Sequence, residues 1–430
     1  MGDVIYYVST KGNTLKPTWL KIAFLNLLVV ALLGLFLRWQ FVQPTEGINF
    51  KNFLHAHSHV ALLGWLFSAF YLAFLPTYLP ENHARKKIYS WLFWLAQTSV
   101  LGMLISFPIQ GYALFSITFS TLHILFSYAF IYRFLKDCKS SELVKTQHKL
   151  SFRFIKASLF FLALSSLGPW VMGPIMATGN SFTELYYNAI YFYLHFQYNG
   201  WFTFAALGLF FWLLEHYQIT FNRQKATVFF KLIFRACLPA YLLSVLWIKP
   251  DAWIYIIAGI SALMQVIALV LFTRISLSFW PQLFRKLNSW SRALMLLAFT
   301  AFSLKILMQA VSAFPYFADL TYKLRHFIIG YLHLVLIGFV SLFLFGWFLQ
   351  LGWISLRNRM AKIGLVAFLL AFLLTEGLLF LQGIFYWAKL GMIPHYDWWM
   401  FGLSVGLPAG LLMLFLNISF QKKLTTQLSS

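Results

Sequence analysis

The residues most able to do chemistry in this sequence are histidines set within long apolar stretches. Three of them, His59, His195 and His333, lie in runs rich in Leu, Phe and Val. An ionisable side chain is costly inside a lipid bilayer and is usually functional there. A single buried histidine more often only hydrogen-bonds a neighbouring helix, so the case for a cofactor depends on how several histidines lie together.

These three histidines are expected to share one layer of the membrane. Counted inward from the outer end of each apolar run, at about 1.5 Å per residue, His59 lies roughly 9 Å deep, His333 roughly 14 Å and His195 roughly 17 Å. Three separate helices would then carry an imidazole at similar depth. This indicates a constellation rather than scattered single residues.

Two of the histidines also share a local pattern. His59 and His333 are each followed by four apolar residues, a glycine (Gly64 or Gly338) and an aromatic residue. On a helix that glycine lies about 140° around from the histidine. We therefore expect the histidine to face a cofactor and the glycine to let its helix pack closely against a neighbour.

A histidine from each of two helices could ligate the two faces of a haem iron. Such a bis-histidine haem has no open coordination site, so it carries electrons and does not bind substrate. The chain contains no Cys-x-x-Cys-His run, and its two cysteines, Cys138 and Cys237, lie in separate segments. This excludes covalent c-type attachment and gives no indication of a disulfide framework.

The elements that must position these histidines are transmembrane helices. The chain is 61% hydrophobic and only 10% charged, whereas soluble domains carry about 25% charged residues. Runs of roughly 20 apolar residues are long enough to span a bilayer. They predict an all-α polytopic bundle of about twelve helices, forming one integral membrane domain over residues 1–430, at 18–42, 53–79, 88–107, 111–135, 153–177, 184–215, 226–248, 252–279, 290–314, 324–352, 362–388 and 396–418.

The net charge of +22 is interpreted as a topology signal rather than as a nucleic-acid-binding surface. Basic clusters follow every even-numbered span, whereas the connections after odd-numbered spans are poorer in Lys and Arg. The positive-inside rule then places both termini in the cytoplasm. A bacterial inner membrane is the expected location, with the lipid bilayer as the main partner.

At these residues the chain resembles subunit I of the haem–copper oxidase superfamily, especially its cbb3-type and nitric-oxide-reductase-like branch. That family has twelve core helices and holds its low-spin haem by histidines on helices 2 and 10, where His59 and His333 fall. The segment Tyr193–Trp201 looks like the helix 6 segment that supplies the first copper ligand, which would be His195. The run His57-Ser58-His59 is also similar to the His-Ala-His motif of the NnrS family. The resemblance implies haem b as cofactor.

The departures from the family pattern concern the oxygen-reducing centre. Tyr331 stands where the family has the histidine that ligates the high-spin haem, and the expected seventh span holds no histidine. Copper would be left with His195 alone, which is not a site. Tyrosine can ligate haem iron, so a high-spin haem at Tyr331 stays open, and with it an oxygen or nitric oxide reductase.

Several other polar residues could serve the same site. Arg38, Arg325 and His55 could neutralise haem propionates, although arginines near a membrane surface also snorkel to the interface. Lys305 and Glu376 could pair with each other or conduct protons. The roles of His57, His123 and His326 are left open.

The sequence thus predicts a degenerate haem–copper-oxidase-like protein that uses a low-spin haem for redox relay or sensing. It could work with an electron-donor protein or an oxidase-like subunit, and no nucleic-acid partner is expected. The alternative is a secondary transporter of twelve helices, which would usually show repeats and broken helices around a site at the membrane midplane.

Overall fold

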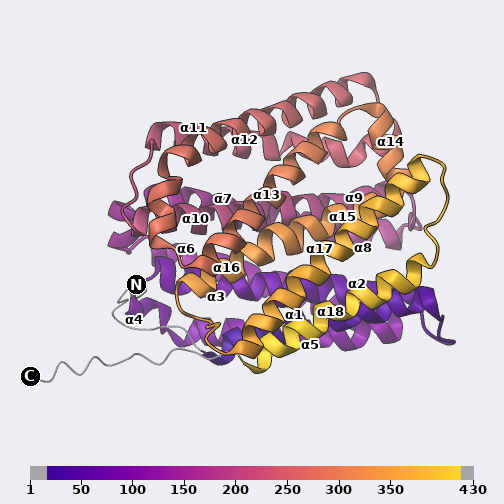
Figure 1. The fold of residues 1–430 in the computed structure, drawn as a ribbon, viewed down its shortest axis with the longest axis horizontal. Coiled ribbons are helices and arrows are strands. Elements are labelled where there is room, and N and C mark those ends of the chain that lie inside the picture. The colour runs from indigo at the N-terminus through magenta and orange to yellow at the C-terminus, as the bar shows by residue number, and fades with distance from the viewer. Residues whose placement is uncertain (1–16, 418–430) are drawn as a thin grey trace, which may run out of the picture.

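The computed structural model describes residues 17–417, apart from the side chains of Leu143 and Lys145. Every regular element in this range is a helix, and the long helices lie alongside one another in one bundle (Figure 1). The polytopic helical architecture expected from the sequence is therefore confirmed. The last residue of the expected twelfth span (396–418), and the basic residues Lys422 and Lys423 that follow it, lie outside the described residues.

The described chain runs through the bundle in twelve helical passes. They are α1 (Pro17–Val42), α2–η1–α3 (Phe50–Tyr78), α5 (Lys87–Gln110), α6 (Leu114–Cys138), α7 (Lys149–Ser165) with α8 (Leu167–Ala177), α9–η3–α10 (Glu184–His216), α11 (Arg223–Cys237) with η4 (Pro239–Ile248), α12 (Ala252–Lys286), α13 (Ser289–Val311), α15–η5–α16 (Arg325–Gln350), α17 (Arg359–Trp387) and α18 (Tyr396–Leu416). Short helices, among them α4 (Glu81–Ala84) and α14 (Pro315–Lys323), lie in the connections.

Eleven of these passes are long and apolar enough to cross a membrane. The pass α9–η3–α10 is not among the eleven, because polar side chains such as Gln197 and Asn199 lower its hydropathy. Its inner half, from Phe196 to Glu215, is nevertheless buried throughout. This pass is shielded from the surroundings by other helices, which is why it tolerates polar residues.

Three passes lie at the centre of the bundle, and each contains a π-helical segment directly after a histidine. The segments are η1 (Val60–Leu66) after α2 (Phe50–His59), η3 (Phe196–Phe202) after α9 (Glu184–His195), and η5 (Leu334–Ser341) after α15 (Arg325–His333). All three follow one pattern of histidine, four residues, glycine and aromatic residue. Single π-helical turns are rare and frequently mark functional sites.

The remaining passes form three arcs around the central ones. Contacts run from α5 through α6 and α7 to α10, from α11 through α12 and α13 to α16, and from α17 through α18 and α1 to α2 and η1. Each arc of three passes thus leads to one central pass. The inner halves of the central passes, α3 (Phe67–Tyr78), α10 (Thr203–His216) and α16 (Leu342–Gln350), are almost wholly buried, whereas their outer halves α2, α9 and α15 are only partly buried.

The glycines of the repeated pattern do pack against neighbouring helices, as the sequence predicts. A Cβ added at Gly64 would lie 3.0 Å from Val100 and 3.2 Å from Asn26, and one at Gly338 would lie 2.9 Å from Phe372. The central passes are also linked directly. The indole nitrogen of Trp65 donates to the Ser341 hydroxyl at 2.9 Å.

The fifth pass bends where its prolines require it. α7 ends at Ser165 and α8 begins at Leu167, so the break falls just before Gly168-Pro169. Pro169 has no N–H to donate to the carbonyl four residues earlier, and this interrupts the helix.

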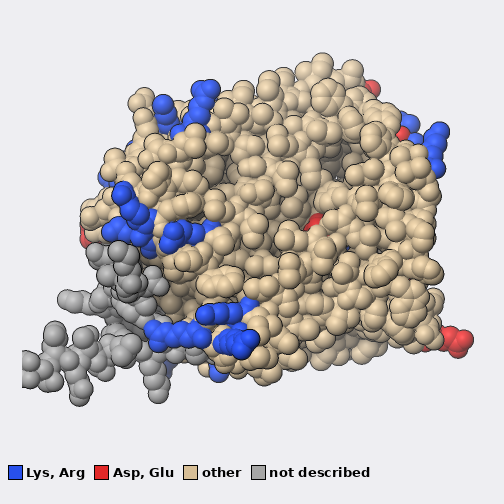
Figure 2. Space-filling view, viewed as in Figure 1, with Lys and Arg blue, Asp and Glu red and all other residues tan. Residues whose placement is uncertain are grey.

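Basic side chains gather at one end of the bundle, and the middle of the visible face is almost free of charge (Figure 2). At that end Asp137 accepts from Lys86 at 2.7 Å, from Tyr89 at 2.8 Å and from Arg133 at 3.0 Å. Figure 2 also shows acidic atoms within the uncharged middle of the face, at a distance from both charged ends.

Candidate cofactor site

The best-defined polar pair inside the bundle joins α15 to α17. The Nδ1 atom of His333 lies 3.3 Å from Oε1 of Glu376. This is an ion-pair distance without an aligned hydrogen bond, since neither Glu376 oxygen has a hydrogen-bond partner among the described residues. Glu376 is buried, whereas the His333 side chain is 32% exposed despite its central position. His333 therefore keeps part of its ring accessible beside the buried carboxylate.

On the second pass, His57 is the histidine on the same side as His333. Its Nδ1 lies 3.0 Å from the carbonyl oxygen of Val30 in α1, and its charge interacts with those of His333 and Arg38. A Cβ at Gly34 would lie 3.1 Å from the His57 ring. A side chain at this position would be tight against the ring, so glycine lets α1 pack closely there.

His59 faces the other way, because two residues along a helix correspond to a rotation of about 200°. Its ring centroid lies 4.3 Å from that of Phe107 on α5 and 6.1 Å from that of Tyr112. Its Nδ1 lies 2.8 Å from the carbonyl oxygen of His55. The structure thus brings His57, and not His59, to the side of His333.

His55 shares the face of His59, as expected, and its ring lies 4.6 Å from that of Tyr112. Both His59 and His123 line a cavity of about 160 Å³ between the second, fourth, fifth and sixth passes. The Nε2 atom of His123 is buried there without a hydrogen-bond partner among the described residues. This cavity is separate from the surroundings of His333.

Charged groups lie beside the His57 and His333 pair on its outer side. Arg38 interacts electrostatically with Glu376 and with Asp397. His326 interacts with Arg38 and Asp397, and its ring lies 5.7 Å from that of Tyr396. Arg38 therefore lies close to the His333–Glu376 pair, where the sequence predicts it. His326, left without a role by the sequence, joins it.

Arg325 does not belong to this group. Its side chain is exposed and it interacts with Tyr191 on α9. It therefore lies towards the sixth pass, although it is the next residue to His326 along the chain. Its expected part in neutralising a propionate beside His333 has no support from these contacts.

His195 is held on both sides by protein groups. Its Nε2 lies 2.9 Å from the carbonyl oxygen of Cys237, and its Nδ1 lies 3.0 Å from Nδ2 of Asn199. Neither nitrogen is free for a copper ion in this arrangement, and the described residues contain no cluster of three or more His, Cys, Asp or Glu side chains that could hold a metal. His195 thus links the sixth pass to the seventh.

Tyr331 points into a second and larger cavity of about 490 Å³ between the sixth, seventh, ninth, tenth and eleventh passes. Its hydroxyl is buried without a hydrogen-bond partner among the described residues, and its ring packs edge-on to that of Tyr198 at 5.8 Å. Tyr198 is the one ionisable group that interacts with it. Among the described residues, no cation is an electrostatic neighbour of Tyr331.

The expected pairing of Lys305 with Glu376 is wrong. Lys305 is buried among the ninth, sixth and seventh passes, where it interacts with Cys237 and His195. Its ammonium nitrogen lies 5.7 Å from the ring centroid of Phe302. The partner of Glu376 is His333 instead.

Sequence reasoning missed the parts played by His57, Glu376 and Gly34. The signal for His57 was present, because His57 and His59 must face opposite sides of one helix. Which of the two sides holds His333 depends on how the second pass is rotated within the bundle, and the sequence does not give that rotation. The contact between Gly34 and His57 is a tertiary one with no local signature.

No protein-family profile matches the chain, and no curated protein matches its sequence. Among solved structures, a haem–copper terminal oxidase determined as a dimer by cryo-electron microscopy has a similar fold. The TM-score is 0.63 at 12% sequence identity, and the match covers 92% of this chain and 82% of the oxidase chain. The chain therefore has a haem–copper-oxidase-like fold. Its place in the cbb3-type or NnrS-like branch stays a prediction.

Proposed function

We propose that this chain is a multi-pass membrane haem protein that carries electrons. In this proposal a low-spin b-type haem lies between α2 and α15, with His57 and His333 as its axial ligands. The observation that carries it is His333, whose Nδ1 lies 3.3 Å from the buried Glu376 carboxylate while its side chain stays 32% exposed.

The ring nitrogens of both histidines suit this role. Val30 and Glu376 each lie beside an Nδ1 atom, which leaves both Nε2 atoms without a hydrogen-bond partner among the described residues. A histidine that ligates a metal usually donates its other ring N–H to a backbone carbonyl or a carboxylate. The pair His59 and His333, which the sequence favours, stays a prediction, but His57 fits the geometry better.

Other groups of the chain would hold and orient the haem. Arg38 and His326 lie on the outer side, where they could bind its two carboxylates through charge-assisted hydrogen bonds. Gly34 keeps the His57 ring close to α1. A haem ligated by two histidines supplies one-electron transfer and has no open position for a substrate.

Redox relay or sensing is the role that this arrangement supports. The surroundings of His195 supply no further metal ligands among the described residues, so the proposal does not include a copper centre. The fold similarity to an oxidase chain makes a partner subunit or a donor protein part of the proposal, in a bacterial inner membrane.

The test is the reduced-minus-oxidised visible spectrum of the purified protein and of three variants. We expect a sharp low-spin b-type band in the wild type and in His59→Ala, and its loss in His57→Ala and His333→Ala. A band that survives in His57→Ala but vanishes in His59→Ala would restore the other pair. A colourless wild-type protein after expression with added haem would refute the proposal.

A further inference from the structure

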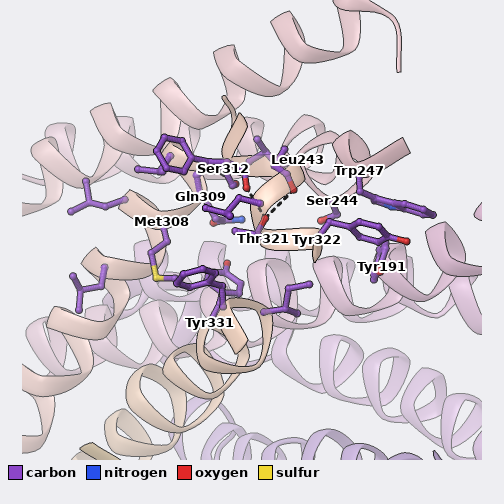
Figure 3. Close-up of a pocket in the computed structure, with 18 of the residues that line it drawn as sticks. Tyr191, Leu243, Ser244, Trp247, Met308, Gln309, Ser312, Thr321, Tyr322 and Tyr331 are labelled. Atoms are coloured by element: carbon purple, nitrogen blue, oxygen red, sulfur yellow. Dashed lines mark hydrogen bonds between the residues drawn. The ribbon is translucent and has the colours of Figure 1, made fainter. Parts of the chain in front are cut away.

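The larger cavity has properties that the haem proposal does not use. It holds about 490 Å³, within the range of small-molecule sites, which is roughly 300–1,000 Å³. Figure 3 shows Tyr331 from α15 and Gln309 from α13 pointing into the same space, with Trp247, Tyr322 and Tyr191 gathered at its other end.

The mouth of this cavity lies on the lipid side of the bundle. Leu307 and Val311 on α13 are 47% and 45% exposed, and Ile384 and Trp387 on α17 are 45% and 47% exposed. All four line the cavity, and both helices are apolar enough to cross a membrane. A ligand can therefore enter sideways from the bilayer, as a lipid-soluble molecule would.

The lining excludes a charged ligand. It is made of apolar, aromatic, hydroxyl and amide side chains, and no Asp, Glu, Lys, Arg or His is among its residues. A fatty acid, a phospholipid headgroup or a haem with its two carboxylates would each bring an unpaired charge, which is costly to bury. The ligand must be neutral.

Two buried polar groups of the cavity indicate that the ligand carries a polar group of its own. The Tyr331 hydroxyl and Oε1 of Gln309 are both buried without a hydrogen-bond partner among the described residues, which is expensive unless a ligand or water satisfies them. A phenol hydroxyl can donate or accept. A ring hydroxyl could accept from Tyr331 and donate to Gln309, and a keto oxygen could accept from either group once the amide has turned over.

Aromatic side chains suit a flat head group. The rings of Trp247 and Tyr322 are stacked with centroids 4.8 Å apart at one end of the cavity, and Phe327 also lines it. From the lateral mouth, the neutral lining and the two unpartnered polar groups, we infer that this cavity binds a membrane-soluble isoprenoid quinone or quinol. Its ring would reach Tyr331 and Gln309, and its tail would leave between α13 and α17.

The test is equilibrium binding of radiolabelled decylubiquinone to the purified protein in lipid nanodiscs. We expect one saturable site per chain. The variants Tyr331→Phe and Gln309→Leu should each weaken binding about tenfold, since a lost hydrogen bond of about 1.4 kcal/mol changes an affinity by that factor. Ser312→Ala is the matched control, because this hydroxyl lines the cavity but already donates to the Gln309 backbone carbonyl at 2.8 Å.

Further measurements keep this test independent of the haem proposal. Decylubiquinone binding should persist in His333→Ala, and circular dichroism checks that each variant is folded. Absence of saturable binding, or equal affinity in the wild type, Tyr331→Phe and Gln309→Leu, would overturn the inference. Two haems per chain in the wild type, with one lost in Tyr331→Phe, would also overturn it, because a haem would then occupy this cavity. Displacement of decylubiquinone by a sterol at equal concentration would overturn it as well.

Discussion

At the scale of single residues, the candidate site depends on which neighbour holds each imidazole. His57 and His59 are two positions apart, yet one lies against the Val30 carbonyl of α1 and the other against the rings of α5 and Tyr112. Glu376, on the eleventh pass, takes the equivalent orienting position beside His333 of the tenth pass. A carboxylate next to a ligating histidine raises the basicity of the ligand.

Replacing Glu376 with Gln tests this orienting role. The negative charge of Glu376 favours the more positive oxidised iron, so Glu376→Gln should raise the reduction potential of the proposed haem, by about 59 mV for each tenfold change in relative affinity for the two oxidation states. A potentiometric titration of the visible band measures this. Thr375→Val is the control, since Thr375 bonds only within its own helix, to Ala371 at 2.8 Å, and an equal shift there would contradict the role.

At the scale of elements, the same local structure, a histidine followed by a π-helical segment, occurs in all three central passes. Each central pass carries a histidine, then a π-helical segment with a glycine and an aromatic residue. In two of the three, a hydroxyl eight residues after the histidine donates to the carbonyl five residues before it. Thr203 donates to Tyr198 at 2.6 Å, and Ser341 donates to Leu336 at 2.7 Å. The third occurrence of the pattern, at His195, was visible in the sequence and makes the repeat threefold.

The hydrogen bond from Trp65 in η1 to Ser341 in η5 should be measurable as a coupling between the effects of the two substitutions on the free energy of unfolding. Ser341→Ala leaves the buried Trp65 indole without its acceptor, and this should lower the free energy of unfolding by about 1–3 kcal/mol. In a Trp65→Phe background the same change should cost less, because the donor is already gone. Unfolding in mixed detergent micelles gives both values. Ser404→Ala, whose hydroxyl bonds only Met400 of its own helix at 2.6 Å, is the control, and a cost for Ser341→Ala that Trp65→Phe leaves unchanged would contradict the link.

At the scale of the whole molecule, the apolar runs and the basic clusters between them located the passes, including the sixth, whose hydropathy alone is too low for a candidate membrane span. Each expected span overlaps one helical pass, and the ends differ because polar turns continue a helix beyond its apolar part, as in α12, which extends to Lys286. His59, His195 and His333, which the sequence predicts to share one depth, each stand directly before the π-helical segment of a central pass. What the sequence could not give is the rotation of each pass about its axis, since tertiary packing sets it. That is why His57 and not His59 lies on the side of His333, and why Lys305 lies beside Cys237 and His195 rather than beside Glu376.

Topology is the property of the whole chain that remains a prediction, and surface thiols can test it. Glu46, between α1 and α2, and Lys225, at the start of α11, are both exposed and lie at opposite ends of the bundle. The native thiols Cys138 and Cys237 are only 1% and 3% exposed, so they give little background. The positive-inside rule places the basic end in the cytoplasm. A membrane-impermeant maleimide added to intact cells should therefore label Glu46→Cys and not Lys225→Cys, while both should react after the cells are opened. The reverse pattern in intact cells would invert the bundle and place the proposed haem in the cytoplasmic half of the membrane.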